Sequence, residues 1–160
     1  MSIVLHCLAI LNRQGTPVYM RTFDSTGRSA ETAAKQQDQC VKYHYLAHTS
    51  CDVIEERLLQ NKTSSDLYFG LLQTIGDVSV YGYVLNTGNR LILVTSVPAE
   101  SSAVQTAEIK ALFQQIHATY VSLICNPFYD MAADMMDHLG NINSPKFDSI
   151  VDDLVNAYSS

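Results

Sequence analysis

The sequence predicts an α+β fold in which a five-stranded sheet is covered by helices on both faces. One observation is a hairpin, in which two apolar runs, Val78 to Leu85 and Arg90 or Leu91 to Val97, flank a turn-forming Asn-Thr-Gly-Asn cluster. Another is that Leu91 to Val94 is apolar at consecutive positions. Because neighbouring side chains of a strand face opposite sides of the sheet, this run requires cover on both faces.

The remaining strands are expected on the N-terminal side of this hairpin. Ile3 to Leu11 is apolar on both of its faces, which favours a central strand. Val18 to Phe23 follows a turn as a second strand, and Leu67 to Leu72 is predicted as a third. Gly70 and Gly82 lie inside predicted strands, where glycine indicates a bulge or the close approach of a packed helix.

Amphipathic helices are predicted on either side of the hairpin. Cys40 to Gln60 carries an apolar stripe at helical spacing. That stripe consists of Tyr43, Leu46, Ala47, Ser50, Cys51, Ile54 and Leu58. Ser102 to Cys125 forms a second helix, Met131 to Leu139 suggests one or two turns, and Phe147 to Tyr158 forms the last helix. The predicted order is β-β-α-β-β-β-α-α.

Residues 1–160 are expected to fold as one domain with a polar surface loop at about residues 24–39. Asp24 to Gln39 has no apolar periodicity, although a helical turn around Ala30 to Lys35 is an alternative. The apolar start of the chain is too short to span a bilayer and lacks the leader of a secretory signal. Four scattered cysteines without a C-x-x-C pair then indicate free thiols in a cytosolic protein.

The charge of the chain argues against nucleic acid as a main partner. The net charge is −6, and phosphate binding needs clustered lysine and arginine. The same composition provides no polybasic segment for acidic lipid.

Two histidines of the first predicted helix have the spacing of a zinc pair. His44 and His48 are four residues apart, but Tyr45 stands where the H-E-x-x-H motif has glutamate. The sequence suggests no third ligand. Surface or packing histidines are therefore the simpler interpretation, and no metal site is predicted.

Three acidic residues, Asp52, Glu55 and Glu56, lie off the apolar stripe of the same helix. General acid-base catalysis needs a sheltered carboxylate, whereas these positions predict a solvated face that could serve for docking. The chain contains no G-x-S-x-G motif, no phosphate-binding glycine loop and no cysteine in a nucleophile setting. The sequence therefore predicts neither an enzyme nor a cofactor.

Several short segments, in order along the chain, carry a resemblance to a known family. They are His44 to Glu56, Tyr68 to Leu72, Val80 to Val84, Asn126 to Tyr129, and Phe147-Asp148. Together they resemble the sedlin family of transport protein particle (TRAPP) subunits, and look most like its subunit 2-like branch. The resemblance extends from about Tyr43 to Val151, which is most of the chain.

The resemblance implies a longin fold, a five-stranded, mostly antiparallel sheet with one helix on one face and two on the other. It also implies a non-catalytic subunit of a complex that tethers vesicles in ER-to-Golgi and intra-Golgi or endosomal traffic and supports nucleotide exchange on Rab GTPases. The implied partners are other TRAPP subunits and, indirectly, Rab GTPases, with peripheral membrane association through the complex. The implied location is the cytoplasm, at the surface of Golgi and ER membranes.

Asp52 matches the acidic position of the family's first-helix motif, whose exposed side the resemblance makes a partner-binding face. The candidate partner-binding residues are His48, Asp52, Glu55 and Glu56. The chain departs from the family pattern in a longer loop at residues 24–39, in Cys51 where leucine is common, and in an expansion at residues 131–143. These departures put in doubt the partner contacts near them, but not the fold.

Two other interpretations stay open. One is a stand-alone longin-domain regulator of SNARE or adaptor type, although a longin SNARE would carry a heptad-repeat helix that this sequence, which ends at Ser160, does not show. The other is a small hydrolase that uses His48 and the nearby acidic residues.

Overall fold

One sheet and three helices make up the part of the chain that the computed structural model describes, which is residues 4–23, 33–60, 66–96, 103–125 and 145–159. In chain order these elements are β1 (Leu5–Leu11), β2 (Pro17–Thr22), α1 (Ala33–Gln60), β3 (Tyr68–Ile75), β4 (Val78–Val84), β5 (Arg90–Thr95), α2 (Ala103–Ile124) and α4 (Pro145–Ser159). The order is the one that the sequence predicts. The expected turns within residues 131–143 lie outside the described residues.

The five strands pair in the order β2-β1-β5-β4-β3, and each neighbouring pair is antiparallel. The β1–β2 hairpin and the β3–β4–β5 meander are joined where β1 pairs with β5. Strand β5 is therefore central, and β2 and β3 are the edges. Its position explains its composition, because every residue from Arg90 to Thr95 is buried.

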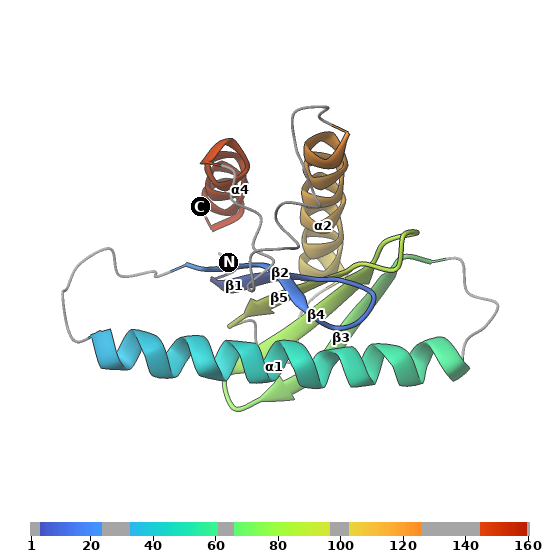
Figure 1. The fold of residues 1–160 in the computed structure, drawn as a ribbon, viewed down its shortest axis with the longest axis horizontal. Helices are drawn as coiled ribbons and strands as arrows, with labels where there is room; N and C mark the ends of the chain where they lie inside the picture. Colours follow the sequence, from blue (N-terminus) through green and yellow to red (C-terminus); the bar gives the residue numbers. More distant parts are fainter. Residues whose placement is uncertain (1–3, 24–32, 61–65, 97–102, 126–144, 160) are drawn as a thin grey trace.

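Helix α1 covers one face of the sheet, and α2 and α4 cover the other (Figure 1). Ile92 and Val94 of β5 belong to the apolar core beneath α1, whereas Leu91 and Leu93 belong to the core beneath α2 and α4. The expectation that this run needs cover on both faces is confirmed. So is the implied arrangement of one helix against two.

Helix α1 is longer than its apolar stripe predicts. It begins at Ala33, so residues 33–39 are helical and the predicted polar loop is wrong over that range. Alanine, lysine and glutamine are strong helix formers, and a helix that is already nucleated can be extended by such residues without packing. The other part of the predicted loop, residues 24–32, lies outside the described residues. Figure 1 shows the N-terminal part of α1 running past the sheet.

The stripe prediction for α1 holds in its middle and fails at its C-terminal end. Leu46, Ala47, Cys51 and Ile54 are all buried, but Leu58 is 41% exposed. Strand β3 also extends beyond its predicted end, to Ile75, before a turn at Gly76 whose φ is +61°. A tight turn of two residues therefore joins β3 to β4, in place of the longer connection that the sequence predicts.

The two glycines inside strands have the two roles that the sequence offered. Gly70 has a φ of +72° and lies where the register between β3 and β4 shifts, which is a bulge. Gly82 lies under α1, where an added Cβ would be 2.6 Å from Leu72 Cδ1 and 3.3 Å from Ile54 Cδ1. Its missing side chain allows the helix to approach the sheet closely.

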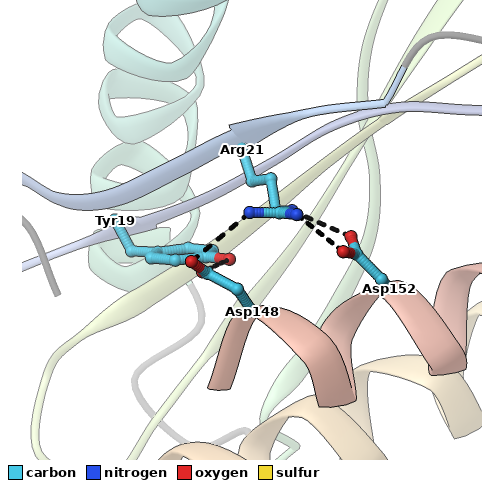
Figure 2. Close-up of polar contacts among 4 residues, drawn as sticks. All are labelled: Tyr19, Arg21, Asp148 and Asp152. Carbon is cyan, nitrogen blue, oxygen red and sulfur yellow. Dashed lines mark hydrogen bonds and ion pairs between the residues drawn. The ribbon is translucent and has the colours of Figure 1, made fainter. Parts of the chain in front are cut away.

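Polar contacts fasten α4 to the edge strand β2 (Figure 2). Arg21 donates from Nε and Nη2 to the two carboxylate oxygens of Asp152, at 2.8 and 2.6 Å. Tyr19 donates its hydroxyl to Asp148 at 2.7 Å, and its ring meets Phe147 edge-on at 5.0 Å. These contacts join residues more than a hundred positions apart in the chain.

All four cysteines are free, as the sequence predicts. Cys7 is buried between β1 and α1, and burial, with a smaller contribution from nearby Cys40, raises the pKa of its thiol to about 12. Burial likewise raises the pKa of the Tyr68 hydroxyl to about 12.

Gly82→Ala is expected to lower the free energy of unfolding by about 1–3 kcal/mol, because the new methyl group forces Leu72 and α1 to shift. Urea denaturation followed by circular dichroism measures the change. Gly76→Asn is the control, since its Cβ meets nothing within 4 Å and asparagine tolerates a positive φ. Equal losses for the two variants would contradict the close approach at Gly82.

Asp152→Asn is expected to cost about 1 kcal/mol, a modest amount because both partners of the Arg21 pair are partly exposed. Thermal unfolding measures it, and the loss should shrink at high salt. Asp153→Asn, one residue on at an exposed position of α4, serves as the control. A loss at Asp152 no larger than at Asp153 would show that the pair contributes nothing.

The stability of the protein is expected to fall as the pH rises above about 9. The raised pKa of Cys7 means that the unfolded chain loses this proton first, so the unfolded state binds fewer protons and unfolding becomes easier. The decline should be on the order of 1 kcal/mol per pH unit and smaller in Cys7→Ala, by urea titration at several alkaline pH values. Cys125→Ala, at an exposed position, is the control. An identical slope in Cys7→Ala and the unmodified chain would contradict the assignment.

Candidate partner-binding surface

The four predicted partner-binding residues lie together on the solvent side of α1. His48, Asp52, Glu55 and Glu56 are all exposed, and their spacing places them on one side of the helix. The opposite side of α1 is buried against the sheet. The sequence therefore located this surface correctly, while its role in binding stays a prediction.

Large apolar side chains flank the acidic centre of this surface. Val41 and Tyr45 are 63% and 64% exposed on its N-terminal side, and Leu59 is 72% exposed at its C-terminal end. Together with three of the predicted residues, His48, Asp52 and Glu55, they recur at intervals of four and three residues. All six lie within an arc of about 80° around the helix axis. We call this line the outer stripe: Val41, Tyr45, His48, Asp52, Glu55 and Leu59.

The apolar members of the outer stripe were not predicted from the sequence. A search for amphipathic periodicity assigns apolar residues to the buried side, and Val41, Tyr45 and Leu59 do not fit the buried stripe. Their misfit was the available signal, because exposed apolar side chains gathered in one place mark interaction surfaces. Of the seven large apolar side chains found exposed among the described residues, four belong to α1.

Two polar side chains fix the orientation of α1 on the sheet. Gln73 of β3 donates its amide to Leu46 O, Thr49 Oγ1 and Ser50 Oγ, at 3.4, 2.9 and 3.0 Å. Nearer the C-terminal end of α1, Arg57 donates to the main-chain oxygens of Phe69 and Leu71, at 2.8 and 2.9 Å. The outer stripe is therefore presented by a helix whose rotation is set by hydrogen bonds as well as by packing.

A hollow of about 480 Å³ lies beside the middle of the outer stripe. It is formed by the β1–β2 turn, by α1 and by the first residue of β5. Its lining consists of Gln14, Gly15, Thr16, Pro17, His48, Cys51, Asp52, Glu55 and Arg90. Three of the four predicted residues thus share one concave site, which helical spacing alone could not reveal.

Arg90 is the residue of this site that the sequence analysis did not find. Its side chain is 7% exposed, and Nη2 donates to Glu55 Oε1 at 3.0 Å. Burial opposes the charge of the guanidinium, but the interactions with nearby Cys51 and Glu55 outweigh burial and raise the pKa of Arg90. Arg90 opens an otherwise apolar strand, and its carboxylate partner is 35 residues away, so no local pattern marks it.

The settings of the thiol and the carboxylates decide what this surface can do chemically. Burial raises the pKa of the Cys51 thiol, an effect that nearby Arg90 only partly offsets, so the thiol stays protonated and is a poor nucleophile. Asp52, Glu55 and Glu56 are exposed, which is not the sheltered setting of a general acid. Over the described ranges, no group of three histidine, cysteine or acidic side chains is placed to hold a metal ion.

None of the helices in the described part of the chain has the length and apolar character needed to cross a membrane.

Comparison with known proteins agrees with the fold. A model of the Sedlin family matches residues 10–157. A mouse (Mus musculus) protein is 33% identical over 91% of this chain and 92% of its own length. Proteins of Taeniopygia guttata and Dictyostelium discoideum are 30% and 31% identical, over 93% and 77% of this chain and 95% and 81% of their own lengths. Each of the three is a trafficking protein particle complex subunit 2-like protein, the branch that the sequence motifs resemble. This chain belongs to the sedlin family.

Proposed function

We propose that this chain is a non-catalytic adaptor subunit of a trafficking protein particle (TRAPP) complex, and that it binds a neighbouring subunit through the outer face of α1. The names of its relatives support the complex. The observation that carries the surface is the outer stripe itself, an acidic centre with apolar side chains on both sides, exposed on a helix fixed by hydrogen bonds.

The composition of the outer stripe favours a protein partner. Apolar and aromatic side chains such as Val41, Tyr45 and Leu59 supply the contact area of an interface. Asp52, Glu55 and Glu56 add a negative centre that favours a partner with basic side chains and opposes nucleic acid. His48, Asp52, Glu55 and Glu56 are thus proposed as the residues that set the partner's choice and register.

Through the complex, the chain would support nucleotide exchange on Rab GTPases in ER-to-Golgi and intra-Golgi or endosomal traffic. We place it in the cytoplasm, at the surface of Golgi and ER membranes, with membrane contact made through the complex. The resemblance to the family implies these finer roles, and the exposed carboxylates of α1 favour assembly over catalysis. A hydrolase based on His48 would need a sheltered acid beside it, and its acidic neighbours are exposed.

The alternative is a stand-alone longin-domain regulator of SNARE or adaptor type. Purification of the tagged chain from its own cells, with quantitative identification of co-purified proteins, separates the two functions. Recovery of other trafficking protein particle subunits in fixed proportion supports the proposed function. Recovery of SNARE or coat-adaptor proteins without any such subunit would overturn it.

In the same experiment, Asp52→Tyr is expected to reduce the recovery of at least one subunit about tenfold, because it removes a charge and adds bulk at the centre of the outer stripe. Its melting temperature should stay close to that of the unmodified chain, since Asp52 is exposed. Asp153→Tyr makes the same change on the exposed side of α4 and should leave recovery unchanged. Unaltered recovery with Asp52→Tyr would rule out this face, and a large fall in its melting temperature would show that Asp52 is structural.

A further inference from the structure

The hollow beside the outer stripe contains a buried charge whose hydrogen bonds are incomplete. Arg90 is 7% exposed, and its Nη2 is bonded to Glu55. Its Nε and Nη1 are buried and have no geometrically sound hydrogen-bond partner among the described residues. The Cys51 thiol lies beside the guanidinium, but sulfur is only a weak acceptor.

Such an arrangement is costly for folding alone. A buried donor that has no acceptor loses its hydrogen bonds to water and gains none in exchange. The cost in free energy is larger for a charged group. An apolar residue at this position of β5 would continue the run Leu91–Val94 without that cost. The guanidinium is therefore better explained by an acceptor that arrives from outside than by the stability of the isolated chain.

The hollow offers such an acceptor a place. Arg90 lines it, and its volume of about 480 Å³ lies within the range of small-ligand and peptide pockets. One wall is shared with the outer stripe through His48, Asp52 and Glu55. A polypeptide lying along α1 would therefore reach the hollow without leaving the surface already described.

We propose that the hollow formed by Arg90, α1 and the β1–β2 turn receives a neutral acceptor of a partner polypeptide, a main-chain carbonyl or side-chain amide, beside a lysine or arginine of that partner. The Arg90 side chain turns so that Nε and Nη1, which are buried in the free chain, reach the acceptor and donate to it. Asp52 and the second oxygen of Glu55 hold the basic side chain. This inference deepens the proposed function and rests on it for the partner's identity, but its chemistry can be tested on the isolated chain.

The charges around the hollow decide between a neutral and an anionic occupant. Arg90 is the positive group, Glu55 already pairs with it, and Asp52 adds a further negative charge at the rim. A phosphate or carboxylate would gain Arg90 but would meet two carboxylates at close range. A peptide carbonyl avoids that repulsion, and a neighbouring cation turns the same carboxylates into attractive contacts.

The test is a titration of the full, isotope-labelled chain with N-acetyl-arginine N-methylamide, followed by the amide signals in nuclear magnetic resonance spectra. Saturable shifts are expected at Gly15, Thr16 and Asp52. N-acetyl-alanine N-methylamide, which lacks the cation, should bind about fivefold more weakly, the usual strength of one exposed ion pair. Inorganic phosphate should leave these signals unchanged.

Arg90→Lys keeps the charge beside Glu55 but removes the Nε and Nη1 donors, so it should weaken binding of both peptide probes about tenfold. Arg57→Lys is the matched control, because that arginine also donates to carbonyl oxygens, but to those of β3, and it is not part of the lining of the hollow. Asp52→Asn should remove the advantage of the arginine probe over the alanine probe and leave the alanine probe unaffected. This exposed variant keeps the test decisive if Arg90→Lys does not fold.

Three results would overturn the inference: no shift at the hollow with the arginine probe, shifts there with phosphate instead, or equal affinity in folded Arg90→Lys and the unmodified chain. All three are read on the isolated chain, so they leave the proposed function standing. Conversely, failure to recover any trafficking subunit from cells would remove the proposed function while peptide binding at the hollow persisted.

Discussion

The structure depends on the need to cover both faces of β5. This strand lies at the centre of the sheet, and its side chains alternate between two separate apolar cores. Neither core can form without helices on its own side, so α1 is committed to one face and α2 with α4 to the other. One side of each helix is therefore buried against the sheet. The outer sides of the helices face solvent, and among the described residues α1 presents a continuous line of large apolar and acidic side chains there.

The sequence predicts the layout of the fold because most of its signals are local or periodic. The apolar run at Leu91–Val94, the hairpin turn before it and the stripe through Leu46 and Ile54 each follow from one short segment. The start of α1 could not be found in the same way. Residues 33–39 contain no large apolar side chain, so they show no periodicity, yet good helix formers continue a helix that packing stabilises elsewhere. Leu58 shows the converse. It is in register with the buried stripe, but near the C-terminal end of α1 it is exposed instead of packed against the sheet.

The candidate site likewise contains residues that local sequence patterns indicate and one residue that they do not. His48, Asp52, Glu55 and Glu56 could be predicted because helical spacing decides which side of α1 faces water. Arg90 could not, because its significance comes from a fold that brings the start of β5 under a helix and beside a turn from another part of the chain. The concave character of the site is likewise a tertiary property. Sequence periodicity can thus identify a face, but the depth of that face and the charge beneath it appear only when distant segments meet.

The length of α1 has a further consequence. Val41 and Leu59 are eighteen positions apart on a straight, well-anchored helix, so they are separated by about 27 Å along its axis. That distance exceeds what one small side-chain cluster can span. One neighbour that covered the whole proposed surface would need a contact about as wide as a standard protein–protein interface, whereas smaller contacts would let two neighbours each take one end. In the second case the rise of the α-helix itself would fix the spacing between them, and an insertion of one residue in α1 would both lengthen that spacing and rotate one end relative to the other by about 100°.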